Sequence, residues 1–231
     1  MSKEIFVISL GGSLIVPAGG INNSFLSEFK SAIKNLSKKH KFVIVCGGGS
    51  TARVYIKSLR KAGISNYLQS LIGISITRTN ARFVSYFFDH DSNEGIPHDM
   101  KHVKNLLKKH DIVFCGALRY ADRQTSDSTA AKLAHFLKGT FINMTNVNGL
   151  YTSDPRKDKS AKLIPNVNAL ELCRRANSVK YKPGQHFVID QTASEIILKD
   201  KIKTYIVGGN IKNLINLVSG KKFIGTEVVF N

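Results

Sequence analysis

The stretch KFVIVCGGGSTAR, residues 41–53, decides the predicted fold of this chain. Residues 41–46, apolar from Phe42 on, are typical of a buried β-strand, and three glycines follow at 47–49. A helix is expected to start near Ser50, with Arg53 one turn into it. Glycines between a strand and a helix leave the N–H groups of the helix N-terminus open to a phosphate. The stretch therefore predicts a strand-loop-helix unit that binds an anion.

Four further apolar strand patterns alternate with segments of helical periodicity along the chain. In the first helical segment, Phe25, Phe29 and Ile33 recur at the spacing of one helix face. Strands that alternate with longer helices are typical of an α/β fold with a mostly parallel sheet. In such sheets, ligands bind at the carboxyl ends of the strands. The four strand patterns cover residues 4–10, 111–115, 140–145 and 203–207.

The net charge of the chain is strongly positive. The 231 residues include 34 Lys and Arg against 16 Asp and Glu, a formal charge of +18 at pH 7, and no carboxylate lies between Glu28 and Asp89. This balance favours anionic partners, such as phosphorylated small molecules, nucleic acids or acidic membranes. Many of the cations are also expected simply to solvate the surface. Charge alone does not choose among these partners.

Several classes of protein are excluded or disfavoured by the sequence. The longest apolar runs, residues 5–10 and 42–46, are far shorter than the roughly 18–20 residues of a membrane-spanning helix. No signal-peptide pattern precedes the first strand, which favours a cytoplasmic protein. Cys46, Cys115 and Cys173 form no CxxC pair, so neither a disulfide framework nor a zinc site is predicted. No metal site made of protein side chains is expected.

The glycine loop by itself matches the dinucleotide-binding pattern at Gly47, Gly49 and Ala52, so an NAD-dependent oxidoreductase has to be considered. An NAD site needs an Asp or Glu about 20 residues further on to bind the ribose hydroxyls. This chain has no carboxylate there before Asp89, and its loop follows the second predicted strand rather than the first. The absence of a GxxxxGKS or GxxxxGKT sequence also excludes a Walker-type nucleoside triphosphatase.

A second glycine loop and three later segments complete a set of five motifs. In order along the chain, they are LGGS at 10–13, CGGGSTAR at 46–53, LIGISITRTNA at 71–81, TSDSTAA at 125–131 and TNVNGLYTSDPRKD at 145–158. In this order and with this spacing, the motifs resemble the amino acid kinase family. The second and third motifs together are most similar to those of archaeal-type uridylate kinases.

The resemblance implies an amino acid kinase fold, which is a three-layer αβα sandwich with a mostly parallel central sheet. Residues 1–231 would form one domain, with an N-terminal acceptor lobe of about residues 1–140 and a C-terminal ATP lobe of about residues 141–231. The implied reaction is transfer of the ATP γ-phosphoryl group to UMP, with Mg²⁺ as cofactor. The implied assembly is a homo-oligomer, a hexamer in this family. Binding to a membrane or to nucleic acid is not favoured.

The resemblance also assigns roles to individual residues of the motifs. The implied catalytic residues are Arg53, Ser13 and Asp127. The residues implied to bind UMP are Gly48, Ser70, Arg123, Thr125 and Ser126, the last two just before a helix expected over 128–137. The residues implied to bind ATP are Gly12, Ser13, Gly49, Arg53, Thr145, Asn146, Tyr151 and Asp154.

The implied chemistry suits these residue types. The phosphate of UMP carries an anionic oxygen at neutral pH, so no paired-carboxylate or Ser-His-Asp base is needed. The rate then depends on positioning, and on cations and N–H groups that neutralise the transferring group. A guanidinium group such as that of Arg53 matches phosphate oxygens in geometry. The alternative interpretation of Arg53 is an exposed helix residue.

Four positions depart from the family pattern. Ser9 stands where many members have a lysine, and Ser70 stands where uridylate kinases usually have an aspartate that holds the nucleoside. Asn148 replaces the aspartate of the family's NVDG sequence, and Glu195 occupies a position that is often basic in archaeal relatives. These departures leave the preferred acceptor open.

The loop before the fourth motif also departs from the family. This loop, residues 117–124, is about three residues longer than expected and includes Arg119 and Arg123. One hypothesis is that these guanidinium groups replace a missing cation near the acceptor, and the other is an exposed basic loop.

Two other functions are compatible with the sequence. One is another phosphate-acceptor kinase of the family, such as isopentenyl phosphate kinase, although the histidine of its GGGSxGH loop is absent here. The other is a non-catalytic relative that binds nucleotides or RNA, which the departures and the net charge favour. Turnover of a phosphate acceptor discriminates between an enzyme and a binding protein.

Overall fold

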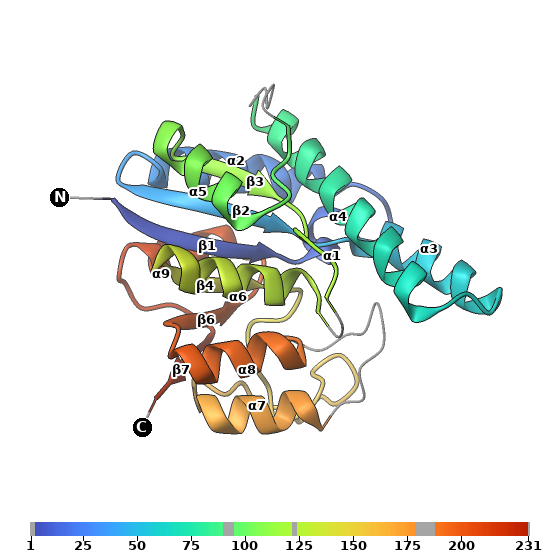
Figure 1. Ribbon diagram of the computed structural model, residues 1–231. Helices are drawn as coiled ribbons and strands as arrows, with labels where there is room; N and C mark the ends of the chain where they lie inside the picture. Colours follow the sequence, from blue (N-terminus) through green and yellow to red (C-terminus); the bar gives the residue numbers. More distant parts are fainter. Residues whose placement is uncertain (1–2, 90–94, 122–123, 179–187, 231) are drawn as a thin grey trace.

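The computed structural model of the chain describes residues 3–89, 95–121, 124–178 and 188–230. These residues build a seven-stranded sheet in the strand order β3-β2-β1-β4-β6-β7-β5, with helices on both faces (Figure 1). The strands are β1 (Glu4–Leu10), β2 (His40–Cys46), β3 (Ile112–Cys115), β4 (Thr140–Met144), β5 (Asn166–Asn168), β6 (Thr204–Val207) and β7 (Thr226–Val229). Every neighbouring pair is parallel except β6 and β7, which are antiparallel.

The strand β1 has neighbours on both sides and helices on both faces. Its side chains Val7 and Ile8 are fully buried, as expected for a strand that is apolar on both faces. It pairs with β2 on one side and with β4 on the other, so the strand ends at Leu10, Cys46 and Met144 lie side by side. The segments that follow these three strands therefore start at the same edge of the sheet.

The mostly parallel sheet predicted from the sequence is confirmed. Each of the five predicted strands starts and ends within one residue of the observed limits. Two observed strands, β5 and β7, have no counterpart among the predicted strands and are three and four residues long. Such short segments carry too few residues for a periodic pattern, and their pairing with each other and with β6 defines them.

The helices form two layers, which makes the three-layer sandwich implied by the resemblance. Each layer encloses its own apolar core against one face of the sheet. One layer contains α1 (Gly12–Ile15), α2 (Asn23–Leu36), α4 (Asn66–Phe87) and α9 (Ile211–Val218). The other contains α5 (Met100–Lys109), α6 (Ser126–Leu137), α7 (Ala169–Asn177) and α8 (Gln191–Asp200). Among the described residues, no helix has the length and apolar character needed to span a membrane.

In the helix α2, the apolar residues that recur with helical periodicity are the ones that pack into the core. Its apolar face buries Phe25, Phe29 and Ile33, and the ring of Phe29 meets that of Phe88 edge to face at 5.9 Å. The helix starts after Asn22, whose side chain accepts a hydrogen bond from the N–H of Phe25. Full burial of each such apolar side chain contributes about 1.5–3 kcal/mol. This layer therefore fixes the strands β1 and β2 that carry the glycine loops.

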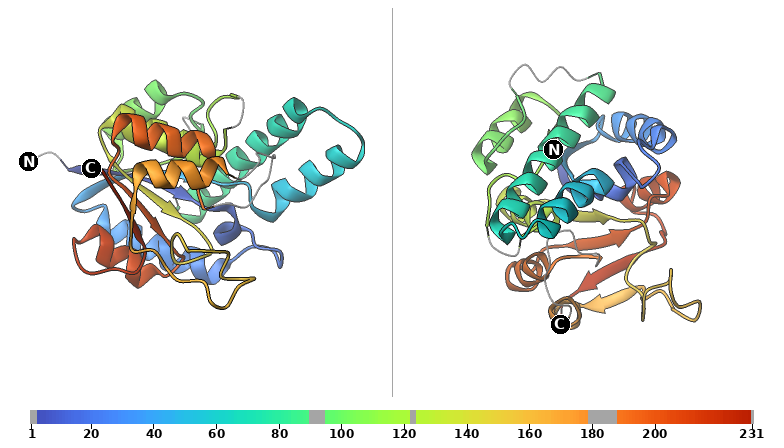
Figure 2. Two further views of the ribbon diagram at one scale, coloured as in Figure 1. Left: turned by 90° about the horizontal axis from the view of Figure 1, so that it is seen from below. Right: turned by 90° about the vertical axis from the view of Figure 1, so that its right-hand side faces the viewer.

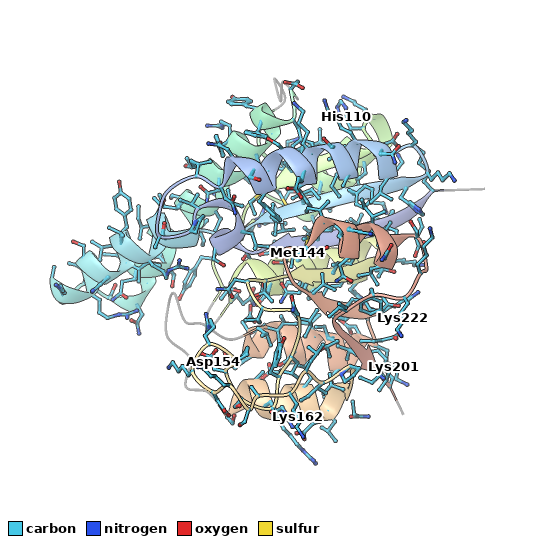
Figure 3. The ribbon with its side chains drawn as sticks, turned by 180° about the vertical axis from the view of Figure 1, so that it is seen from behind. His110, Met144, Asp154, Lys162, Lys201 and Lys222 are labelled. Carbon is cyan, nitrogen blue, oxygen red and sulfur yellow. The ribbon has the colours of Figure 1, made fainter. Side chains whose placement is uncertain are left out.

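The carboxyl ends of the central strands lie on the side from which α3 (Gly49–Lys61) and α4 project as a pair (Figure 2). In the view from behind, Asp154 lies on this side of the molecule, whereas Lys201 and Lys222 lie on the opposite side (Figure 3). Four of the five motifs thus follow the ends of β1, β2, β3 and β4, as expected for an α/β fold, whereas the third lies within α4.

Candidate active site

Two glycine loops lie against each other at the carboxyl ends of β1 and β2. A Cβ atom added to Gly12 in the first loop would lie 2.0 Å from the backbone nitrogen of Gly49 in the second. A Cβ atom on Gly47 would likewise lie 2.5 Å from the nitrogen of Gly12. Gly49 also has φ +64°, a conformation that glycine adopts without steric strain. The loops need glycine because their backbones occupy the space that side chains would fill.

The second loop leads into α3 without a side-chain cap. Gly48 is the N-cap residue of α3 and provides no side-chain acceptor for the first N–H groups of the helix. The N–H of Ser50 donates to the carbonyl of Val16 at 2.9 Å. The other first N–H groups and the helix dipole place partial positive charge at the helix start. The start of α3 therefore has the character of an anion-binding site.

Arg53 lies in the second turn of α3 and lines the cavity next to the loops. Its side chain is half-buried, and the described part of the chain offers it no hydrogen-bond or ion-pair partner. Burial lowers the pKa of its guanidinium group, because removal from water disfavours the charged form. A bound anion would supply the partner that this cation lacks.

The N-terminus of α6 faces the same cavity. Thr125 caps the helix by accepting a hydrogen bond from the N–H of Asp127 at 3.2 Å. The hydroxyl of Ser128 accepts one from the N–H of Thr125 at 3.4 Å, which completes a capping box. The helix consequently starts at Ser126, two residues before the predicted start. Thr125, Ser126 and Asp127 all line the cavity.

Asp127 makes a contact that the sequence analysis does not foresee. Ser9, at the end of β1, is fully buried, and its hydroxyl donates a hydrogen bond to the Asp127 carboxylate at 2.6 Å. Burial, and then the neighbouring carboxylate of Asp190, raise the pKa of Asp127 to about 7, whereas the hydrogen bond from Ser9 opposes this shift. Ser9, one of the departures from the family pattern, thus forms a hydrogen bond with Asp127.

Asp190 is a cavity residue that the sequence analysis misses. It is the N-cap residue of α8 and is only 3% exposed. Its carboxylate accepts hydrogen bonds from the hydroxyl of Thr125 at 2.5 Å and from the N–H of Ser128 at 3.0 Å. The available sequence signal was an Asp directly before a helical segment. That signal indicates a cap for α8, but it does not reveal contacts with α6.

The loop after β4 supplies the residues that the resemblance assigns to ATP. Thr145, Asn146, Tyr151 and Asp154 all line the cavity. The guanidinium group of Arg156 donates to Asp154 at 2.9 and 3.0 Å, and these hydrogen bonds lower the pKa of Asp154 to about 2. Asp154 is therefore present as an ion pair with Arg156 rather than as a free acceptor.

Besides Gly48, Thr125 and Ser126, the residues assigned to the acceptor come from α4 and from the loop after β3. Ser70 lines the cavity, and its hydroxyl donates to the carbonyl of Asn66 at 2.8 Å. Arg119 also lines the cavity, so one of the two arginines of the long loop is placed at the candidate site. Arg123 lies outside the described residues.

The loop after β3 is attached to α4. Arg78 donates hydrogen bonds to the carbonyl oxygens of Ala117 and Leu118. The ring of Tyr120 meets that of Tyr67 edge to face, with centroids 4.8 Å apart. These contacts hold the cavity side of the loop on a long helix.

All these groups surround a cavity of about 470 Å³, a size typical of small-molecule sites. Every predicted site residue that the structure describes lines it. These residues are Gly12, Ser13, Gly48, Gly49, Arg53, Ser70, Thr125, Ser126, Asp127, Thr145, Asn146, Tyr151 and Asp154. The other departures from the family pattern, Ser9, Asn148 and Glu195, are not among the described lining residues.

Comparison of the sequence with known proteins places these motifs in one family. The model of the amino acid kinase family matches residues 4–208. The chain is 34% identical over 223 residues to a uridylate kinase of Archaeoglobus fulgidus, covering 96% of this chain and 98% of that protein. It is 34% identical over 226 residues to a uridylate kinase of Methanothrix thermoacetophila, covering 97% of this chain and 99% of that protein.

Comparison of the fold gives the same relationship. The crystal structure of uridylate kinase from Archaeoglobus fulgidus superposes with a TM-score of 0.82 at 34% identity, covering 97% of this chain and 99% of that chain. An isopentenyl phosphate kinase structure superposes with a TM-score of 0.69 at 18% identity, covering 97% of this chain and 100% of that chain. The second similarity is one of fold alone.

The contact between the glycine loops predicts the effect of a single methyl group. We expect Gly12→Ala to lower the free energy of unfolding by about 1–3 kcal/mol, because the new Cβ atom overlaps the backbone of Gly49. Urea denaturation measures the change. The control is Gly19→Ala, since nothing lies within 4 Å of a Cβ atom at that position. Equal stabilities of Gly12→Ala and wild type would contradict the backbone contact.

The raised pKa of Asp127 predicts a pH-dependent gain in stability for Asp127→Asn. In the wild type, the contribution of Asp127 to stability falls as the pH rises from about 4 to 7, because the unfolded chain releases the Asp127 proton at a lower pH than the folded protein does. Asparagine carries no charge, so the variant avoids this loss. We expect its advantage in unfolding free energy to grow by at least about 1.4 kcal/mol, the value of one pKa unit, between pH 4 and pH 8.

Denaturation at several pH values measures this gain. The control is Asp158→Asn, because hydrogen bonds from Ser153 and Ser160 lower the pKa of Asp158. That variant should instead lose stability relative to wild type as the pH rises. An advantage of Asp127→Asn that stays constant from pH 4 to pH 8 would disprove the raised pKa.

Proposed function

Because the chain belongs to the amino acid kinase family, we propose that it transfers the γ-phosphoryl group of ATP to UMP and releases UDP and ADP. One observation carries the proposal: two glycine loops, Arg53 and the N-terminus of α6 surround a single cavity. The similarity to uridylate kinases over nearly the whole chain supports UMP as the acceptor.

The reaction requires charge stabilisation more than acid–base chemistry. The acceptor oxygen of UMP is already anionic, so the protein has to align it with the γ-phosphorus and offset repulsion between the two phosphates. N–H groups at the start of α3 and the guanidinium group of Arg53 provide positive charge where the groups meet. We assign this role to Arg53 because its side chain is half-buried and has no hydrogen-bond or ion-pair partner in the described chain.

The two nucleotides are assigned to different sides of the cavity. Under this proposal, Gly12 and Ser13 bind the phosphates of ATP, while Gly49 and Arg53 lie where donor and acceptor meet. The remaining donor contacts are assigned to Thr145, Asn146, Tyr151 and Asp154, with Asp154 acting together with Arg156. These four residues belong to the C-terminal ATP lobe, residues 141–231, whereas Gly12 and Ser13 reach the ATP phosphates from the N-terminal lobe.

The acceptor is assigned to the N-terminal lobe, residues 1–140. Gly48 and the first turn of α6, with Thr125 and Ser126, bind the phosphate of UMP in this proposal. Ser70 faces its nucleoside, and a serine hydroxyl forms weaker hydrogen bonds there than the carboxylate usual in uridylate kinases. The proposal therefore includes modest discrimination among pyrimidine nucleotides.

Mg²⁺ enters this reaction as the complex with ATP. The described residues contain no group of three or more His, Cys, Asp and Glu side chains arranged to hold a metal ion. Mg²⁺ often keeps several waters and is bound largely by substrate phosphates. We therefore assign it to the ATP phosphates, where it supplies positive charge to the transferring group.

A homo-oligomer is part of the proposal. Five large apolar side chains with substantial exposure lie on α3 and α4, the two helices that project from the body (Figure 2). They are Val54, Tyr55, Tyr67, Leu68 and Tyr86. Exposed apolar surface on a projecting element is typical of a subunit interface, which supports an assembly of several chains and, by resemblance, a hexamer.

Turnover with a panel of acceptors tests the proposed function. We expect the purified chain with Mg-ATP to phosphorylate UMP faster than AMP or GMP, with smaller differences among UMP, CMP and dUMP because of Ser70. The measurement is ADP formation, with isopentenyl phosphate as a further acceptor. Preference for isopentenyl phosphate would replace the assignment by another kinase of the family. Nucleotide binding without turnover on any acceptor would identify a non-catalytic relative.

The position of Arg53 predicts a large kinetic effect of its removal. We expect Arg53→Ala to lower kcat/KM for UMP roughly 10²–10³-fold, the scale for loss of one group that stabilises transition-state charge. Steady-state kinetics with circular dichroism as a fold check give the value. The control is Lys57→Ala, an exposed cation one turn further along the same helix, which should leave kcat/KM within about twofold. Equal effects of the two variants would show that Arg53 does not stabilise the transferring group.

A further inference from the structure

The Asp190 carboxylate binds hydrogen-bond donors from two helices. From α6 it accepts hydrogen bonds from the hydroxyl of Thr125 at 2.5 Å, the N–H of Ser128 at 3.0 Å, and the hydroxyl of Ser128 at 2.6 and 2.7 Å. From α8 it accepts one from the N–H of Ala193 at 2.7 Å. An ordinary N-cap carboxylate bonds to the N–H groups of its own helix. The carboxylate of Asp190 also accepts hydrogen bonds from donors at the start of a second helix, α6.

The residue that this link holds in place is Asp127. It lies between Thr125 and Ser128, the two α6 residues that bond to Asp190, so its backbone is fixed on both sides. Its side chain then reaches Ser9 at 2.6 Å. β1, α6 and the start of α8 thereby meet through Ser9, Asp127 and Asp190, and Asp127 and Asp190 both line the cavity.

We propose that Asp190 is a positioning residue for phosphoryl transfer, which ties the first turns of α6 and α8 together and so fixes Asp127 beside Ser9 at the edge of the cavity. The proposal rests on the proposed function. It adds a residue from outside the five motifs, whose side chain acts through Thr125, Ser128 and Asp127 rather than on the substrates.

The link also has an electrostatic consequence. Asp190 is the second cause, after burial, of the raised pKa of Asp127. Removal of the Asp190 charge should therefore lower the pKa of Asp127 towards its ordinary value. A side chain away from Asp127 that served only to hold the fold together would affect stability without moving this titration.

The charged groups around Asp127 come from several elements. From the N-terminus of α8 it faces Asp190, and from β1 it faces the hydroxyl of Ser9. The other described charged side chains that line the same cavity are Arg53 on α3, Arg119 in the loop after β3, Asp154 and Arg156 in the loop after β4, and Arg175 on α7. Among the described residues, burial, Asp190 and Ser9 account for the pKa shift of Asp127.

The test compares Asp190→Asn with wild type across pH 5.5–9. In wild type, we expect kcat at saturating UMP and ATP to fall as the pH drops through about 7, because the Ser9 hydroxyl donates to an ionised Asp127. In Asp190→Asn, the midpoint of this fall should move to lower pH by about one unit, and kcat at pH 8 should drop about tenfold through misplacement of α6. The ionisation of the substrates is the same for both proteins and cancels in the comparison.

Two further variants separate positioning from simpler effects. Asp200→Asn removes a carboxylate from the other end of α8 and should leave the midpoint unchanged. Asp190→Ser keeps an N-cap acceptor for α8 while losing the link to α6, and it should behave like Asp190→Asn. If circular dichroism shows that Asp190→Asn does not fold, the same comparison of midpoint and kcat is made with Asp190→Ser. If neither folds, Asp190 serves the fold as a whole and the proposal is wrong.

A lower kcat with an unchanged midpoint would also overturn the proposal, as would an equal shift in Asp200→Asn. If wild type shows no turnover of UMP, the proposed function fails, and the link is then tested without turnover. Titration of the Asp127 carboxyl by ¹³C NMR gives its pKa directly in wild type and variant. A lower pKa in the variant supports the link between Asp190 and Asp127, and equal values refute it.

Discussion

The backbone contact between the two glycine loops is the constraint on which the rest of the site depends. Gly12 and Gly49 approach so closely that a β-carbon on either would overlap the other loop. This contact fixes the starts of α1 and α3, and with α3 it fixes Arg53. Because β1 pairs in parallel with both β2 and β4, the loop after β4 starts at the same edge of the sheet. The cavity is thus a product of strand order as much as of any motif.

The ion pairing of the arginines that line the cavity indicates where an anionic ligand binds more specifically than the net charge of the chain does. Arg156 is paired with Asp154 at 2.9 Å, and Arg175 with Glu171 at 2.7 Å. Arg53 lines the cavity without such a partner in the described chain and is half-buried. An anion placed beside Arg53 therefore gains more than one beside a paired arginine, since it displaces no existing ion pair.

The sequence predicts what is local and misses what depends on distant pairing. The apolar run 42–46, its glycines and the helix after them are encoded in thirteen consecutive residues, which is why the second loop and Arg53 are placed correctly. The strands β5 and β7 are defined by pairing across the chain, and the sequence analysis misses both. The same holds for the Asp190 contacts with α6, which join residues 62 and 65 positions apart. A capping role explains Asp190 locally, so nothing in the sequence calls for a second partner.

The serine at position 9 accounts for the unusual carboxylate at position 127. A lysine at this position would place a positive charge beside Asp127 and keep its pKa low. The hydroxyl of Ser9 supplies a hydrogen bond at 2.6 Å but no charge. The effects of burial and of the Asp190 charge then outweigh this hydrogen bond and raise the pKa of Asp127 to about 7. Arg53 keeps its positive charge throughout this range, since a guanidinium group is not deprotonated in proteins. The cavity therefore combines a constant cation with a carboxylate whose charge changes near neutral pH, and a hydroxyl at the end of β1 leaves that charge unneutralised.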